Sequence, residues 1–123
     1  MATFTKLALQ PAGTTGDGLG ILVVATATAG TAIHTASTTT TTIDELWLYA
    51  YNSDTGAVSV SIEFGGVTSP KDVIKGTIKT QSGLVLMCAG LVLQGNATPK
   101  VVRAFASSAS KISIFGYVNR ITV

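Results

Sequence analysis

Few residues of this 123-residue chain are suited to nucleophilic or acid–base chemistry. The chain has one histidine, His34, and one cysteine, Cys88, so a nucleophile paired with histidine would be Cys88 or a serine. A hydrolytic triad also needs an acid that orients the histidine. His34 stands between Ile33 and Thr35 in a strand-like segment, and no nucleophile-elbow sequence is present. We therefore expect His34 to be a hydrogen-bonded surface or strand histidine, and Cys88 a small buried apolar residue.

The carboxylates are poorly spaced for catalysis or metal binding. Glycoside hydrolysis needs two carboxyl groups that face each other, whereas the adjacent Asp44 and Glu45 would point to opposite faces of a strand. Glu63 falls on the polar side of an alternating segment, where we expect solvent. Asn52 and Asp54 form the best candidate calcium pair, but they fit a turn better. The sequence thus predicts no catalytic residue, no cofactor and no metal ligand, and we expect the protein not to be an enzyme.

The aromatic residues are more informative than the titratable ones. Trp47, Tyr49 and Tyr51 alternate with three aliphatic residues, Leu46, Leu48 and Ala50. Phe115 and Tyr117 repeat the aromatic spacing near the C-terminus. A sandwich core needs only one face of a strand, so the aromatic face is free to contact another subunit, a partner protein or a carbohydrate. The reverse arrangement, with the aromatic face as core and loops over the leucines, stays open. We favour the first, which makes these five aromatic residues candidates for an interface.

The composition favours short strands over helices or disorder. Charged residues make up 11% and hydrophobic residues 46% of the chain, with a net charge of +2, whereas disordered chains combine low hydrophobicity with high net charge. The sequence has no clustered basic stripe of the kind that would indicate nucleic-acid binding. The apolar runs at 20–25 and 84–93 fall short of the roughly 20 residues that span a membrane, and we expect neither a membrane segment nor a signal peptide.

Alternating segments separated by turns predict an all-β protein: an antiparallel β-sandwich or jelly roll of seven or eight strands. The segments 46–51 and 57–64 flank a five-residue turn at 52–56 and are expected to form a hairpin. The segments 84–88 and 91–93 are expected as separate strands. Residues 1–20, with a glycine-rich stretch at 11–20, predict a flexible and extended N-terminal arm, and residues 21–123 a single sandwich domain.

Several segments resemble small structural proteins of tailed-bacteriophage virions, over roughly residues 31–121. The similar segments are IHTA at 33–36, DELWLYAYNS at 44–53, IEFGG at 62–66, SGL at 82–84, AGLVL at 89–93, VRAFA at 102–106 and IFGYVNRI at 114–121. These are structural patterns without reactive residues, so the resemblance brings no catalytic residue with it.

The resemblance implies a capsid decoration (cement) protein, made in the cytoplasm of the bacterial host and bound to the exterior of the capsid. It implies a homo-trimer or homo-dimer that bridges subunits of the major capsid protein and stabilises their lattice. One alternative is a structural protein of the neck, tail or fibre attachment, with similar interfaces. The other is a carbohydrate-binding β-sandwich module that uses Trp47, Tyr49 and Tyr51 as a stacking platform.

Overall fold

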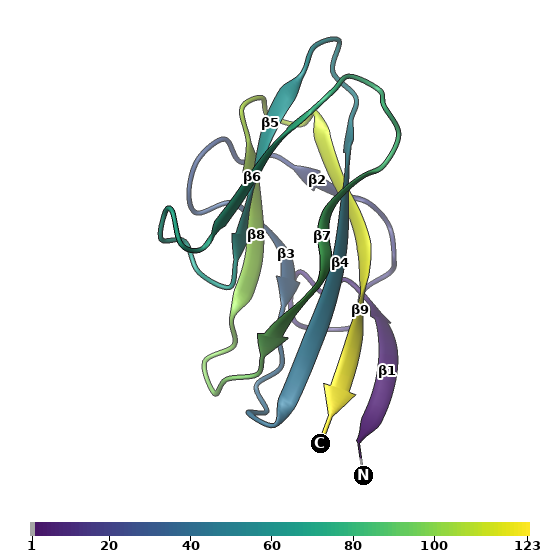
Figure 1. Ribbon diagram of the computed structural model, residues 1–123, viewed down its shortest axis with the longest axis vertical. Helices are drawn as coiled ribbons and strands as arrows, with labels where there is room; N and C mark the ends of the chain where they lie inside the picture. Colours follow the sequence, from purple (N-terminus) through teal and green to yellow (C-terminus); the bar gives the residue numbers. More distant parts are fainter. Residues whose placement is uncertain (1) are drawn as a thin grey trace.

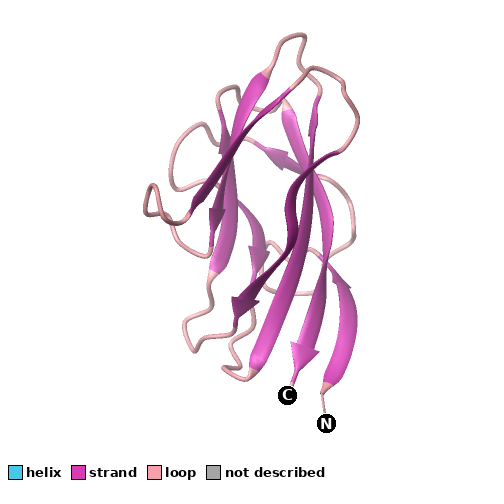
Figure 2. Ribbon diagram, in the orientation of Figure 1, coloured by secondary structure: helices cyan, strands magenta, loops and turns pink. Residues whose placement is uncertain are grey.

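The computed structural model describes residues 2–123 and shows an all-β protein with no helix among these residues (Figures 1 and 2). Met1, the first residue of the predicted arm, lies outside this range. The nine strands are β1 (Thr3–Ala8), β2 (Ile21–Val23), β3 (Thr31–Thr35), β4 (Thr42–Asn52), β5 (Val58–Phe64), β6 (Val73–Ile78), β7 (Val85–Gln94), β8 (Val101–Ala106) and β9 (Ile112–Thr122).

The strands form two antiparallel sheets that pack face to face. The first sheet has the order β1-β9-β4-β7, with β2 on the same side of β9 as β1, and the second has the order β3-β8-β5-β6. The pairs β2·β9, β3·β8, β4·β7 and β5·β6 are nested in the sequence, as in one long hairpin wrapped over itself. This is the topology of a jelly roll, so the predicted fold class is confirmed. The structure has nine strands where seven or eight were expected, because β1 forms within the predicted arm.

The N-terminal residues do not extend away as an arm in the structure. Thr3–Ala8 form β1, which pairs with the C-terminal half of β9, so both ends of the chain lie side by side at one end of the molecule (Figure 1). The loop that follows is fixed at Gln10, whose backbone O accepts a hydrogen bond from Thr35 N. The glycine-rich composition of residues 11–20 marked a loop correctly, but it carried no information about the pairing of β1.

The core fills the space between the sheets. In β4, every second residue is fully or nearly fully buried, including Leu46, Leu48 and Ala50. In β5, Val58, Val60 and Ile62 face them. The aliphatic side of β4 is therefore the core, and the aromatic side is the outer face of the first sheet.

The hairpin predicted from 46–51 and 57–64 is wrong, because the two strands belong to different sheets. Both edges of β4 are already paired, with β7 and β9. The buried Asn52 side chain directs the crossing: its Nδ2 donates to Gly56 O in the turn and to Ile78 O in the second sheet, both at 2.9 Å. A five-residue turn between alternating segments fits a hairpin or a crossing between sheets equally well.

The two strands predicted at 84–88 and 91–93 are one continuous strand, β7. Its pairing with β4 shifts register twice, beside Met87 and Gly90, and Gly90 has a φ of 73°. Glycine accepts this left-handed backbone without strain, and one extra residue in a strand makes a β-bulge. The Ala89-Gly90 sequence therefore marks a bulge, where we expected a break.

Replacing Asn52 by alanine should destabilise the protein by about 2 kcal/mol, because it removes the side-chain donor from the buried Ile78 carbonyl and from the Gly56 carbonyl. Asn96→Ala is the matched control: Asn96 is exposed, and its Oδ1 accepts only the Thr98 N–H of its own turn. Chemical denaturation of both variants measures the difference. Equal losses of stability would contradict the role given to Asn52.

Candidate functional site

The five aromatic residues predicted as an interface gather on the outer face of the first sheet, which we call the aromatic face. β4 and β9 pair over eleven residues without a register shift, and this places Trp47 opposite Tyr117 and Tyr49 opposite Phe115. Opposite residues of an antiparallel pair point to the same face of the sheet. Tyr51 continues the row on β4, and all five side chains are half-buried.

A layer of side chains crosses the aromatic face from one edge towards the other. The rings of Trp47 and Tyr117 are nearly parallel, 11° apart, with centroids separated by 6.3 Å. The Lys6 ammonium of β1 lies 4.7 Å from the Tyr117 ring centroid, in cation–π contact. On the other side, a Cβ added to Gly90 of β7 would lie 3.1 Å from the Trp47 indole. The glycine bulge thus leaves room for the indole to lie close over the edge strand.

Hydrogen bonds fix the orientation of Trp47. Its Nε1 donates to Glu45 Oε1 at 2.8 Å, and Asn119 Nδ2 donates to the same oxygen at 3.0 Å. These two donors hold the pKa of Glu45 below its usual value. Glu45 and Asn119 also border a hollow of about 350 Å³. Its lining consists of Phe4, Thr5, Lys6, Glu45, Asn119 and Ile121. The aromatic face therefore combines parallel rings with one acidic, one amide and one basic group.

Exposed aliphatic side chains extend the aromatic face over β2 and β7. Leu22 lies opposite Ser113, Leu86 opposite Tyr49, and Val92 opposite Glu45, so all three share this face. Val92 is 60% exposed and Leu86 47%. Exposed apolar side chains gathered on one face are a feature of interaction sites in soluble proteins.

The outer face of the second sheet has a different character. Its positions include Ser59, Ser61, Glu63, Lys75, Thr77, Arg103 and Phe105, which are mostly polar or charged. The prediction that Glu63 faces solvent is wrong, because the loop before β3 covers it. Its carboxylate accepts hydrogen bonds from Gly30 N at 2.7 Å and from the Thr28 hydroxyl. Strand periodicity identified the outward direction but carried no information about the covering loop.

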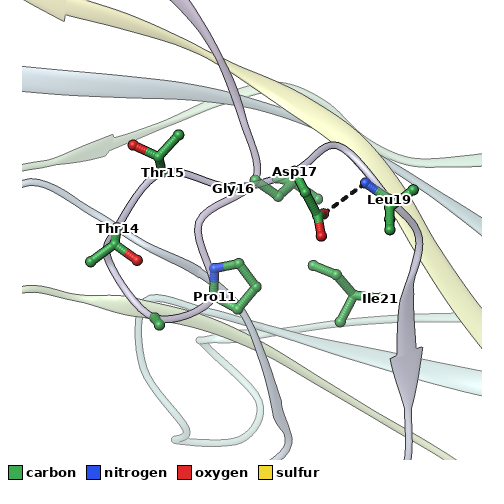
Figure 3. A pocket seen from close by; sticks show the side chains of 9 residues that line it. Pro11, Thr14, Thr15, Gly16, Asp17, Leu19 and Ile21 are labelled. Carbon is green, nitrogen blue, oxygen red and sulfur yellow. Dashed lines mark hydrogen bonds between the residues drawn. The ribbon is translucent and has the colours of Figure 1, made fainter.

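A small pocket of about 240 Å³ lies inside the loop between β1 and β2 (Figure 3). Pro11, Leu19 and Ile21 supply apolar walls, with Thr14 and Thr15 on the loop. The one carboxylate of the pocket, Asp17, accepts the Leu19 N–H at 3.0 Å, as Figure 3 shows. Because this acid closes its own turn, the pocket offers less binding chemistry than the aromatic face.

His34 is fully buried in β3, in a network that joins the two sheets. Its Nδ1 accepts the Gln10 backbone N–H at 3.1 Å, so the ring proton lies on Nε2, which donates to Asp44 Oδ2 at 2.7 Å. Arg120 of β9 binds both oxygens of the same carboxylate, at 2.7 and 2.9 Å. The prediction of a hydrogen-bonded strand histidine is confirmed, and the network links β3, β4, β9 and the N-terminal loop.

Asp44 is the charged centre of this network and is 1% exposed. Burial alone would raise its pKa, but the hydrogen bonds from Arg120 and His34 outweigh burial and lower the pKa to about 2. Asp44 and Glu45 point to opposite faces of β4, as the sequence predicted. Their roles differ accordingly: Asp44 joins the sheets, and Glu45 orients Trp47.

The remaining candidate residues have structural roles. Cys88 is buried, as expected, and burial raises the pKa of its thiol to about 11. Asn52 Oδ1 accepts the Asp54 N–H at 2.8 Å, so Asn52 and Asp54, the candidate calcium pair, form part of a turn. Residues 2–123 contain no group of three or more histidine, cysteine or acidic side chains that could hold a metal ion. They also contain no helix long and apolar enough to cross a membrane.

No protein-family model matches the chain, and no curated protein sequence matches it. The site is therefore defined by its geometry alone. Sequence reasoning missed Lys6, Glu45, Asn119, Leu86 and Val92 as parts of the aromatic face. The period-two pattern around Tyr117 could have indicated Asn119, but the strand pairing that brings Lys6 to this face had no local signal.

The Asp44 network should make stability depend on pH between about 4 and 2. A carboxyl whose pKa falls from 3.8 to about 2 on folding contributes about 2 kcal/mol above this window, and the contribution is lost as the pH falls through it. In Asp44→Asn, this part of the pH dependence should disappear, and stability at pH 7 should drop by about 3–5 kcal/mol.

Chemical denaturation of the parent protein and of Asp44→Asn from pH 7 to pH 2 measures both effects. Asp17→Asn is the control, because Asp17 contacts only the Leu19 N–H of its own loop. The same dependence of stability on pH in the parent protein and in Asp44→Asn would contradict the role given to Asp44.

Proposed function

We propose that the chain is a structural protein of a bacteriophage particle, a capsid decoration protein that binds the major capsid lattice through its aromatic face. The observation that carries the proposal is the outer face of the first sheet, where Trp47 and Tyr117 pair among exposed aliphatic side chains. A protein that works within an assembly buries such a face against its partner.

Tyrosine and tryptophan suit this role because they bury a large area and have few rotamers to fix. The rings are already oriented before binding: Glu45 holds the indole of Trp47, and Lys6 covers the Tyr117 ring. Preorganised side chains lose less entropy on association. The scarcity of charge also limits the cost of removing water from the face.

The fold and the sequence support the same class of protein. Jelly rolls are frequent in viral capsid proteins, although a fold alone does not define a function. The similarity of segments such as DELWLYAYNS at 44–53 and IFGYVNRI at 114–121 to small virion proteins falls on β4 and β9. These are the two strands that carry the aromatic residues.

A carbohydrate-binding module is the second candidate, and one observation favours it. Two residues that line the hollow contact the parallel rings: Glu45 accepts the Trp47 N–H, and Lys6 lies over Tyr117. Stacking rings next to groups that bind hydroxyls suit a sugar. Lys6 lies over the Tyr117 ring, however, and would have to move before a sugar could stack there. We therefore rank this function below the capsid role.

Trp47→Ala should weaken binding of the purified protein to phage particles that lack it by about 30-fold, the effect of losing an interface hot spot worth about 2 kcal/mol. The particles are those of the phage that encodes the chain, and co-sedimentation measures occupancy. Phe105→Ala is the matched control, because Phe105 is also half-buried and aromatic but lies on the outer face of the second sheet.

The number of copies in each purified particle distinguishes a capsid protein from a neck or tail protein. On the order of hundreds of copies indicates the capsid, and about a dozen or fewer indicates the neck or tail. Absence from the particle, or equal losses of binding in both alanine variants, would contradict the proposal. Circular dichroism of both variants confirms that they are folded.

A glycan array compares the parent protein with Trp47→Ala. The second candidate function predicts binding by the parent protein that the variant loses. No binding by either protein would end the carbohydrate proposal and leave the virion proposal unaffected.

A further inference from the structure

β7 forms one free edge of the first sheet, and the end of this strand is unprotected. It runs for ten residues, Val85–Gln94, without a charged residue or a proline. The edge of a sheet presents unpaired backbone N–H and C=O groups that can pair with another chain, and proteins commonly protect such edges with lysine, proline, short strands or β-bulges. β7 has no lysine or proline, and its two bulges, beside Met87 and Gly90, protect only its first part.

The other edge strands are better protected. β6, at the edge of the second sheet, carries the exposed Lys75 and is followed by Lys79. β1 carries Lys6. β3 is short, and its last residue, Thr35, already donates its backbone N–H to Gln10 O. Two copies meeting through β6 would bring lysines together, whereas two copies meeting through β7 would bring no charges together.

Exposed apolar side chains concentrate at the same edge. Leu84, Leu86, Leu91 and Val92 lie in β7 or directly before it and are 41–60% exposed. The bulges beside Met87 and Gly90 interrupt the first part of the strand. Residues 91–94 pair regularly with β4 and form the part of the edge that can accept another strand.

We infer that β7 is a homodimer interface, in which the strand pairs antiparallel with β7 of a second copy about a two-fold axis at Val92. Residues that lie directly opposite each other must point to the same face of the joined sheet. Neighbours in sequence point to opposite faces, so the residue at the axis must lie opposite the same residue of the second copy. Val92 is the most exposed apolar side chain of the strand. A two-fold contact uses the same patch on both copies, which an uncharged edge permits.

The geometry of this pairing has a consequence for the aromatic face. A two-fold axis that relates antiparallel neighbours in one sheet is perpendicular to that sheet, so both copies present their aromatic faces on the same side. Under the proposed function, on which this consequence rests, the dimer would contact a capsid through two linked faces. Linked sites bind more tightly than either site alone when both can engage. The dimer itself does not depend on the proposed function.

Sedimentation equilibrium of the isolated chain should give twice the 12.5 kDa mass of one copy. Val92→Lys and Val92→Glu should each be monomeric, because each places like charges across the axis, and an equal mixture of the two should restore a dimer. Val92 is 60% exposed, so both variants should keep the fold, which circular dichroism checks. A monomeric parent protein, or dimers of unchanged strength in both single variants, would overturn the inference.

Disulfide trapping tests the register independently. Val92→Cys should form a cross-linked dimer under mild oxidation, because opposite residues of an antiparallel pair lie within the reach of a disulfide. Thr77→Cys is the control, an exposed position on the edge strand β6. Equal cross-linking of both variants would overturn the pairing through β7. The native Cys88 is buried and does not compete. Failure here would leave the virion proposal standing, because the particle-binding assay does not require a dimer.

Discussion

The structure depends on the central strand β4, which must bury one face and present the other. Successive residues of a strand point to opposite sides, so placing Leu46, Leu48 and Ala50 in the core also places Trp47, Tyr49 and Tyr51 outside. The uninterrupted pairing of β4 with β9 adds Tyr117 and Phe115 to the same outer face. The aromatic face is thus a direct consequence of the strand pairing that builds the core.

The buried Asp44 network and the aromatic face share these two strands. Arg120 and Asp44 connect β9 to β4 on the inner side, while Tyr117 and Trp47 connect them on the outer side. His34 extends the inner network to the second sheet and to Gln10. The charge pairing inside and the ring pairing outside therefore hold the same strands in one register. In our account, a rigid pair of strands is what presents the aromatic rings in a fixed arrangement.

Local patterns in the sequence predicted much of this structure. Period-two alternation located β4 and β5, the aromatic residues, and the opposite directions of Asp44 and Glu45. Such patterns depend only on strand geometry and hold wherever a strand separates core from surface. Within each strand the aromatic candidates share one face, as expected from their spacing, and the pairing of β4 with β9 brings the two sets together.

Features that depend on distant parts of the chain were not predictable in this way. The connection after Asn52 crosses between the sheets because its side chain bonds to β6, and the loop over Glu63 turns an outward position into a buried one. The pairing of β1 with β9 joins residues at opposite ends of the chain. Each of these contacts is set by tertiary structure, which local periodicity does not encode.

A reconstruction of the virion at a resolution that separates strands would test whether the aromatic face binds the capsid. We expect density for many copies of this jelly roll on the capsid exterior, with Trp47 and Tyr117 buried against the major capsid protein. Copies whose aromatic face is open to solvent, with contacts made by the second sheet instead, would contradict it.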